Sequence, residues 1–475
     1  MIGLWRQEWH LFVKARANVG LLAVLLVLSA LGAWNGIERL AAERSAAVAA
    51  LADDVSSFAA KREKLVQLEA GKIVEGRFGS PRKPQQAVLS SGRPVTPPPA
   101  ELGVLSSAEA RPTPELLRIS ILTRHKDQQP TLDDPSNRLD GPFDLAFVAT
   151  WLGPLFALIL GYDVLARDRE QGVAALLASQ GRSLAAIAFA RLGVRFAALM
   201  IVIGGVAFGA AIVTESGRLA VALPAFAVWL LALGLSLGFW LALTAVINGR
   251  AKNAAAASLA VLGVWIGLSM FMPALIGSVV NTLAPPPDRL QGVLKLRSVE
   301  SDLNRRRREV TAAYYSAYPA NRPIVQGDEY EHYFVTELYP RTLAFDRAVT
   351  PFAAQMDAAR VRQAELMRAA SFLSPSLAFK LLTEDLAGAA PERRVAFLTS
   401  VDDYQARWRG HFDHKLASMT WLTVADYDHK PEFKRAAERA AARWARISLL
   451  MAALCAPLLI ALAGAWRALS RAAPT

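Results

Sequence analysis

The residues of this chain that could ligate a metal ion gather near its C-terminal end. His411 and His414 stand three positions apart with Asp413 between them, and Asp428 and His429 follow. On a helix, two histidines at this spacing lie on one face and could both bind zinc. A metal site needs further ligands, however, and the sequence does not point to any. We therefore expect the polar face of a helix here and predict no metal site.

Sequence patterns that carry enzyme chemistry are absent. The chain lacks the GxxxxGK[ST] loop that cradles ATP, and it lacks GxSxG and HExxH. Its one cysteine, Cys455, excludes a disulfide framework and any cysteine-based metal cluster. Because Cys455 lies in an apolar segment, we expect it to act as a small apolar filler. We expect a chain that is not an enzyme and binds no cofactor itself.

The composition is that of a membrane protein. Of 475 residues, 53% are apolar and 20% are charged, and the mean hydropathy is +0.26. Soluble globular proteins carry about 25% charged residues and about 45–50% apolar residues. The apolar excess is concentrated in blocks of about 20 residues, the length that an α-helix needs to cross about 30 Å of hydrocarbon. This pattern excludes a soluble enzyme, a disordered chain and a collagen-like rod.

Six apolar segments predict an all-α integral membrane protein with both termini on one side. The first could be a secretory signal peptide, because Lys14 and Arg16 precede it. Its apolar core of about 19 residues is longer than the roughly 7–15 typical of a signal peptide, so we expect a span. The predicted spans are residues 19–37, 143–162, 192–214, 220–247, 254–281 and 444–466.

The charge distribution predicts the orientation of these spans. The short connections and tails hold 12 basic and 4 acidic residues, whereas the two long loops hold 39 basic and 35 acidic residues. Short basic segments stay in the cytoplasm, and long loops cross the membrane whatever their charge. We expect a bacterial inner membrane protein with cytoplasmic termini. The net charge of +12 then comes mainly from the basic cytoplasmic segments, so we predict no nucleic-acid partner. The cytoplasmic pieces are residues 1–18, 163–195, 248–253 and 467–475.

Residues 1–18 predict an amphipathic helix that lies on the membrane surface. Ile2, Trp5, Trp9 and Phe12 recur three or four positions apart, and the charged residues occupy other positions. Such a helix contacts membrane lipid and places its tryptophans at the depth of the headgroups. The alternative is an ordinary N-terminal extension of the first span.

The two long loops, residues 38–142 and 283–443, predict a large helical extracytoplasmic domain built from two inserts. The first span continues into a polar helical pattern over 38–70, and glycines and prolines in 71–100 then favour extended chain. We expect the two loops to fold together, with a sharp turn at Ser374–Pro375. Helical patterns in the second loop cover residues 288–317, 343–370, 392–417 and 431–443, the last leading into the sixth span.

The spans contain small residues in place of ionisable groups. No Asp, Glu or Lys lies in the middle of a span, whereas ion-coupled carriers place such groups there. Glycines four positions apart allow helix backbones to approach closely, and we expect at least one such pair to mark a contact between helices. The pairs are Gly205 with Gly209, Gly234 with Gly238, and Gly263 with Gly267.

The segment after the second span reads YDVLARDREQGVAALLASQGRS over residues 162–183. It resembles the connection between spans 2 and 3 of ABC-2-type permeases, the membrane subunits of one class of ATP-binding-cassette transporter. Glu170, Gln171 and Gly172 match their E-x-G element, and Val173 replaces the usual Thr. The stretches 141–156, 372–388 and 397–412 resemble a subgroup related to the nitrous-oxide-reductase maturation permease. Many members of that subgroup are described only as containing a domain of unknown function.

The resemblance implies a permease that dimerises and is driven by a separate ATPase dimer, which binds the ATP and Mg²⁺. The second permease copy would be identical or closely related. Residues 163–191 would form the cytoplasmic coupling region, with a docking helix from Arg167 to Gln180 that contacts the ATPase. Its expected coupling residues are Arg167, Asp168, Arg169, Glu170, Gly172, Leu176 and Leu177.

Three functions remain open. The first is a transport permease of unknown substrate, with export favoured over import. The second is a mechanotransmitter, which relays the motion of the ATPase to a periplasmic or outer-membrane partner and passes no substrate. The third is a membrane receptor or scaffold without an ATPase. The first is the function that we expect. The large extracytoplasmic inserts raise the second above its usual rank, and the coupling segment argues against the third.

The predicted topology can be tested by cysteine labelling in intact cells. We expect single cysteines at positions 57 and 316, in place of Ser57 and Ser316 and in a Cys455→Ser background, to react with a membrane-impermeant maleimide. Cysteines at positions 183 and 470, in place of Ser183 and Ser470, should react only after the cells are opened. Labelling of position 183 in intact cells would contradict the orientation.

Overall fold

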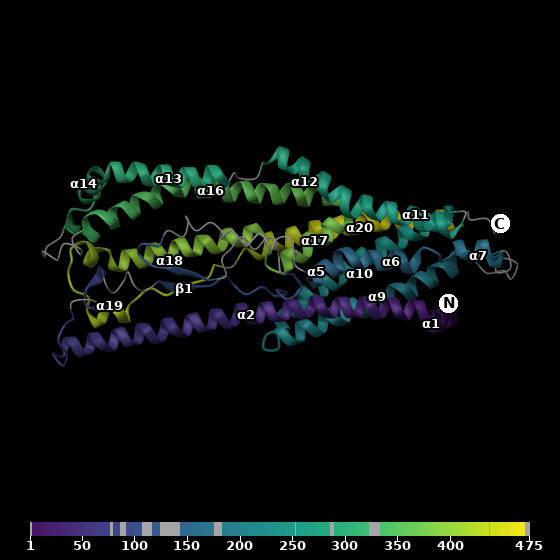
Figure 1. Cartoon of the computed structure of the whole chain (residues 1–475), viewed down its shortest axis with the longest axis horizontal. Coiled ribbons are helices and arrows are strands. Elements are labelled where there is room, and N and C mark those ends of the chain that lie inside the picture. Colours follow the sequence, from purple (N-terminus) through teal and green to yellow (C-terminus); the bar gives the residue numbers. More distant parts are fainter. Residues whose placement is uncertain are drawn as a thin grey trace.

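The computed structural model describes the chain as a long bundle of helices (Figure 1). Within the described residues the only sheet pairs two short antiparallel strands, β1 (Arg93–Val95) and β2 (Leu117–Ile119). The predicted all-helical character is therefore confirmed for this part of the chain. The described residues are 2–76, 79–85, 92–106, 116–123, 143–174, 183–251, 253–285, 289–322, 333–436 and 438–470.

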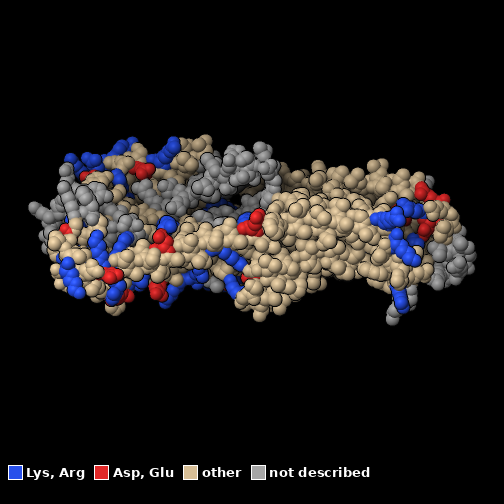
Figure 2. Space-filling view, turned by 60° about the horizontal axis from the view of Figure 1, so that its bottom comes forward, with Lys and Arg blue, Asp and Glu red and all other residues tan. Residues whose placement is uncertain are grey.

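Six helical stretches among the described residues are long and apolar enough to cross a membrane. They cover the six predicted spans, although the second begins at Leu145 and not at residue 143, so the chain is a multi-pass membrane protein. In the space-filling view, a broad zone without charged side chains separates the charged part of the molecule from a second charged zone at one end (Figure 2). The stretches are α2 (Arg16–Glu69), α5–η1–α6 (Leu145–Phe147, Val148–Leu152, Gly153–Gly161), α9 (Leu184–Thr214), α10 (Leu219–Arg250), α11–η2–α12 (Ala254–Trp265, Ile266–Phe271, Met272–Leu283) and α20 (Ala440–Ser470).

Helix α10 lies at the centre of the spans. Trp229, Leu233, Leu237 and Trp240 on this helix are all fully buried, and α10 packs against α6, α9 and α20. Two spans contain a π-helical turn, η1 in the second and η2 in the fifth. Such turns interrupt the regular α-helical hydrogen bonding, so some of their backbone groups are left to be satisfied by neighbours.

The N-terminal helix and the C-terminal end of α20 lie at the same end of the spans, which we call the terminal end (Figure 1). Helix α1 (Ile2–Lys14) lies there against α9, in the segment predicted to be an amphipathic helix. Beyond the opposite end of the spans the remaining helices form what we call the distal domain.

The first span continues without a break into the distal domain. Helix α2 has 54 residues, which corresponds to about 81 Å at a rise of 1.5 Å per residue. This confirms the helix predicted over residues 38–70. Two glycines let other backbones approach α2: a Cβ at Gly32 would lie 2.8 Å from the carbonyl carbon of Asp144, and one at Gly36 would overlap the carbonyl oxygen of Val104.

The distal domain is built mainly from the second insert. Its helices agree with the patterns at 288–317, 343–370 and 392–417, although the first of these divides at Arg306. The elements are α13 (Arg289–Arg305), α14 (Arg307–Ala317), η3 (Pro319–Asn321), η4 (Phe334–Leu338), α16 (Tyr339–Ala370), η5 (Ser371–Leu373), α17 (Pro375–Leu386), α18 (Pro391–Ala417) and α19 (Val424–Asp428).

The helix predicted over residues 431–443 is wrong for most of its length. Helix α20 begins only at Ala440, and the described residues 430–436 are not helical. Pro431 disfavours helix in the residue before it. Phe433 packs on the core of the distal domain, and Arg435 donates a hydrogen bond to Oγ1 of Thr96 at 2.8 Å. Side-chain contacts with the first insert therefore hold this segment in an extended path.

The two inserts share one hydrophobic core, as predicted. Leu65 of α2, with Val95 and Ile119 of the two strands, packs in the same cluster as Tyr404 and Trp408 of α18. These five side chains are at most 2% exposed. The first insert thus contributes an edge of the distal domain, and the second contributes most of its helices.

Helix α17 joins the distal domain to the spans. Ser374 has extended backbone angles and caps α17 through Oγ, which accepts from the amide of Leu377, so the predicted turn at Ser374–Pro375 is confirmed. Phe379 and Leu382 of α17 are fully buried in the hydrophobic cluster that also holds the spans. The sequence patterns did not predict this helix, which has only 12 residues and carries Lys380, Glu384 and Asp385 among its apolar side chains.

The close approach at Gly36 predicts a sharp effect of substitution. Gly36→Val should destabilise the protein by about 1–3 kcal/mol, because its side chain would overlap a backbone carbonyl that cannot move independently. The measurement is thermal unfolding of the purified protein in detergent. The matched control is Gly20→Val on the same helix, where a Cβ would meet nothing within 4 Å. An equal melting temperature for the two variants would contradict the packing described here.

Candidate functional site

The connection between the second and third spans holds the predicted coupling residues, and it does not form one helix. Helix α7 covers only Ala166–Glu170. Gly172 then adopts a φ of +71°, which side chains other than glycine rarely adopt. The expected helix from Arg167 to Gln180 is thus wrong as a single element. Leu176 and Leu177 lie outside the described residues.

Asn248 on α10 holds the bend between α6 and α7. Its Oδ1 accepts hydrogen bonds from the amides of Leu165 and Ala166, both at 3.3 Å, and its Nδ2 donates to the carbonyl oxygen of Gly161 at 3.2 Å. Asn248 is 1% exposed. The side chain therefore replaces the backbone hydrogen bonds that are lost where the second span ends.

The last two residues of α7, Arg169 and Glu170, bind the turn between the fourth and fifth spans. Arg169 Nη1 donates to the carbonyl oxygens of Asn248 at 2.8 Å and Ala251 at 3.1 Å, at the C-terminal end of α10. Glu170 Oε1 accepts from the amide of Ala254 at 3.3 Å, at the N-terminal end of α11. A cation at a helix C-terminus and an anion at a helix N-terminus both complement the helix dipole.

Asp168 links α7 to the third span and to α1. Its Oδ2 lies 2.5 Å from Nη1 of Arg191, and Nε of the same arginine lies 3.3 Å from Glu8. All three side chains are less than a fifth exposed. On the same face Trp5 of α1 covers Gly193 of α9, where a Cβ would overlap the indole ring. Helix α1 is therefore fixed to α9 by packing and by charge.

The residues that make these contacts form a cluster, which we call the coupling cluster. Its members are Glu8, Asp168, Arg169, Glu170, Arg191 and Asn248. It joins α1, α7, α9 and α10, and the Glu170 contact adds α11, all at the terminal end of the spans. Of the predicted coupling residues, Asp168 and Arg169 mainly serve these internal contacts. Arg167 has a side chain that is 56% exposed and, among the described residues, pairs with Asp163 of its own segment at 2.9 Å. The exposed edge consists of Arg167, Glu170, Gln171 and Gly172.

Sequence reasoning missed Glu8, Arg191 and Asn248 as members of the site. The helical pattern places Glu8 only on the polar face of α1, and the charge count includes Arg191 only as a cytoplasmic charge. A signal exists for Asn248, since an amide at the end of an apolar span has to find hydrogen-bond partners. Its partners cannot be named from the sequence, because they are backbone atoms of a different span.

The glycine pairs differ in their surroundings. A Cβ added at Gly234 would face Phe196 and Met200 of α9, and one added at Gly238 would face Leu458 of α20, at distances of 3.5 to 3.9 Å. At Gly205, Gly209, Gly263 and Gly267 an added Cβ would meet nothing within 4 Å. Within this chain, the pair on α10 thus lies at helix contacts, and the other four glycines face outward.

The histidines lie in the distal domain. His411 Nε2 lies 2.8 Å from the carbonyl oxygen of Asp426, and His414 is exposed. Asp413 points to the other side of α18, where it accepts hydrogen bonds from the hydroxyls of Tyr314 and Tyr339. No group of three potential metal-binding side chains occurs within the described residues.

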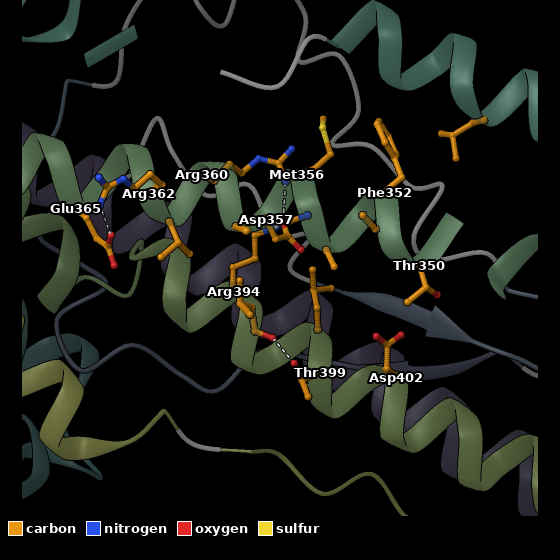
Figure 3. Close-up of a pocket in the computed structure, with 17 residues that line it drawn as sticks. Thr350, Phe352, Met356, Asp357, Arg360, Arg362, Glu365, Arg394, Thr399 and Asp402 are labelled. Atoms are coloured by element: carbon orange, nitrogen blue, oxygen red, sulfur yellow. Dashed lines mark hydrogen bonds and ion pairs between the residues drawn. The ribbon is translucent and has the colours of Figure 1, made fainter. Parts of the chain in front are cut away.

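A cleft of about 500 Å³ lies in the distal domain between α13, α16 and α18. Asp357 of α16 accepts from Arg360 at 2.7 Å and lies 3.7 Å from Nε of Arg394 on α18 (Figure 3). Burial lowers the pKa of Arg394. Phe352 and Met356 point away from α18 in the same view. The carboxylate of Asp357 is thus already paired to arginines on both helices.

Comparison with known proteins adds one match. The family described as "Domain of unknown function (DUF3526)" matches residues 289–435, which is less than half of the chain. The matched segment contains α13 to α19 and the whole lining of the cleft. No curated protein and no solved structure matches the chain.

The contacts of Asn248 predict a large effect of its removal. Asn248→Leu should lower the melting temperature in detergent, because two amides and a carbonyl would lose partners, at a cost of about 1–3 kcal/mol for each buried group. The control is Ser258→Ala, since that exposed hydroxyl donates to the carbonyl oxygen of Ala255 in its own helix and to no other described residue. If Asn248→Leu proves as stable as Ser258→Ala, the bend does not depend on this amide.

Proposed function

We propose that the chain is the permease subunit of an ABC-2-type transporter, working as a dimer and driven by a separate ATPase. The observation that carries the proposal is the coupling cluster. The five residues from Asp168 to Gly172 include side chains that contact α9, α10 and α11. Through Arg191 of α9 they are also linked to α1. A displacement of this short segment would therefore act on several spans at once.

The chemistry of the exposed edge supports an ATPase as the partner. Arg167 and Glu170 offer charges of both signs, and the turn at Gly172 presents backbone without a side chain. Charged groups of this kind fix the register of a docked protein. ATP and Mg²⁺ would be bound by the ATPase, and this chain would supply the spans. A second permease copy, identical or related, would complete the pathway.

The proposal includes an orientation. The terminal end would face the cytoplasm of a bacterium, and the distal domain would lie on the outer side of the inner membrane. The 12 basic and 4 acidic residues of the short connections support this direction. The substrate would then move between the cytoplasmic side and the space around the distal domain, with export favoured.

A mechanotransmitter is the second candidate, and α2 favours it. One helix of 54 residues runs from the terminal end into the core of the distal domain. Motion of the first span would therefore be passed directly to the cluster that contains Leu65 and Trp408. The two candidates differ in whether ATP turnover moves the distal domain relative to the span ends. Spin labels at Ser57 and Gly217 would measure that movement.

Charge reversal at the exposed edge tests the ATPase assignment. Glu170→Arg should weaken association with the ATPase at least tenfold, in line with about 2–5 kcal/mol for a desolvated charge pair at an interface. The measurement is co-purification with a candidate ATPase, followed by ATP hydrolysis in nanodiscs. Gly172→Leu should also uncouple hydrolysis, whereas Gly172→Asn should be milder because Asn tolerates positive φ.

Two controls make this test specific. Glu170→Gln can still accept from the Ala254 amide, so it separates loss of charge from loss of the helix cap. Arg218→Glu reverses an exposed charge at the opposite end of the spans and should leave association unchanged. Wild-type association and hydrolysis in Glu170→Arg and Gly172→Leu would refute the docking assignment and favour a scaffold.

A further inference from the structure

A second cavity lies where the distal domain meets the spans, and nothing in the proposed function uses it. This junction pocket has a volume of about 370 Å³, within the range of about 300–1,000 Å³ that is typical of small-molecule sites. One wall is the stretch of α2 from Leu40 to Leu51. The opposite wall is formed by residues 96–100, the turn between α17 and α18, and Arg435.

The α2 wall of the junction pocket is apolar and exposed. Val48 is 66% exposed and Leu51 is 38% exposed. Both lie on the distal side of Arg44, which binds the carbonyl oxygen of Thr214 and the carboxylate of Glu215 where α9 ends. Val48 is one turn of helix beyond that level, on the side of the distal domain. Its exposure leaves an apolar surface open to a ligand.

The opposite wall carries positive charge. Arg393 Nη2 donates to the carbonyl oxygens of Pro98 and Pro99, at 2.6 and 2.8 Å. Arg435 donates to the hydroxyl and carbonyl oxygens of Thr96. Because these acceptors lie within four consecutive residues, the two guanidinium groups flank one short segment of chain. Neither group forms an ion pair within the described residues.

The other charged groups of the lining are already paired. Arg44 binds Glu215, Glu43 binds Arg39, and Arg394 lies 3.7 Å from Asp357. The carboxylates that attract Arg393 from a distance include Glu101 and Asp385. Their contacts are with Arg443 and Arg446. Burial lowers the pKa of Arg393, and an anion at this wall would offset the loss of hydration.

We propose that the junction pocket binds an anionic amphiphile, with its acyl chain against Val48 and Leu51 and its carboxylate or phosphate facing Arg393 and Arg435. The pocket lies beside the distal ends of the spans. The same chemistry is found in an anionic membrane lipid, which would enter from the adjacent leaflet, and in a free fatty acid, which would enter from solution. The proposal does not depend on the ATPase assignment.

The test measures binding to the purified full chain without an ATPase. A dansyl-labelled undecanoic acid, in a neutral detergent, is compared with its methyl ester. The acid should bind and the ester should bind at least tenfold more weakly, because a hydrogen bond to a charged group is stronger than one to a neutral group. For the lipid source, native mass spectrometry compares nanodiscs of phosphatidylglycerol with nanodiscs of phosphatidylcholine.

Variants assign the binding to the junction pocket. Arg393→Gln combined with Arg435→Gln should weaken the acid at least tenfold, whereas the corresponding double Lys variant, which keeps the charge, should lose less. Val48→Asp should also weaken binding. It changes an exposed residue and so provides a test even if the arginine variants fail to fold. The matched control is Val55→Asp, because Val55 is exposed on the same helix but does not line the pocket.

Each outcome has a defined meaning. Retention of phosphatidylglycerol alone would identify a membrane lipid as the ligand, and binding of the free acid alone would identify a soluble amphiphile. Equal binding of acid and ester, unchanged binding in Val48→Asp, or no binding of either probe would overturn the proposal. None of these results bears on ATPase association, which is measured with different variants at the other end of the spans.

Discussion

Backbone N–H and C=O groups in the hydrocarbon region of a membrane have to find hydrogen-bond partners within the protein. This constraint determines where the structure can bend. Regular α-helix meets the constraint by itself, so the informative places are those where the helix is interrupted. After α6, the side chain of Asn248 completes the hydrogen bonding of the chain. At the π-turn η2, the hydroxyl of Ser374 donates to the carbonyl oxygen of Leu268 at 2.8 Å. Both interruptions are thus satisfied by a side chain from another element.

One interruption lies at the terminal end of the spans and the other in the middle of the fifth span, and they connect to different parts of the molecule. Asn248 holds the segment that we propose as the docking site, whereas Ser374 begins α17, the joint to the distal domain. Helix α17 binds three spans: Ser376 contacts Ser269 of η2, Thr383 accepts from the indole of Trp229, and Asp385 pairs with Arg446 of α20. The distal domain is therefore attached to the spans by polar contacts in addition to the continuous helix α2.

Much of the fold could be predicted from the sequence, because it depends on local patterns. The span positions follow from apolar length, the extension of α2 follows from its helical composition, and the turn at Ser374 follows from the proline after it. Helix α17 and the extended path of residues 430–436 could not be predicted. Their conformations depend on contacts with distant residues such as Trp229 and Thr96. Tertiary contacts of this kind override local preference.

The position of the segment between the second and third spans could be predicted from the sequence, but its internal contacts could not. The charges of Arg167 to Glu170 indicated a protein-docking surface, yet Asp168 and Arg169 are used to hold other helices. A surface that also anchors its own scaffold has a mechanical consequence. A partner that pulls on Glu170 or on the backbone at Gly172 acts on a segment that is already bonded to Arg191 and to the end of α10. Force applied at this small exposed edge would reach the spans through short, charged and partly buried contacts. These contacts would deform less under the force than a flexible loop would.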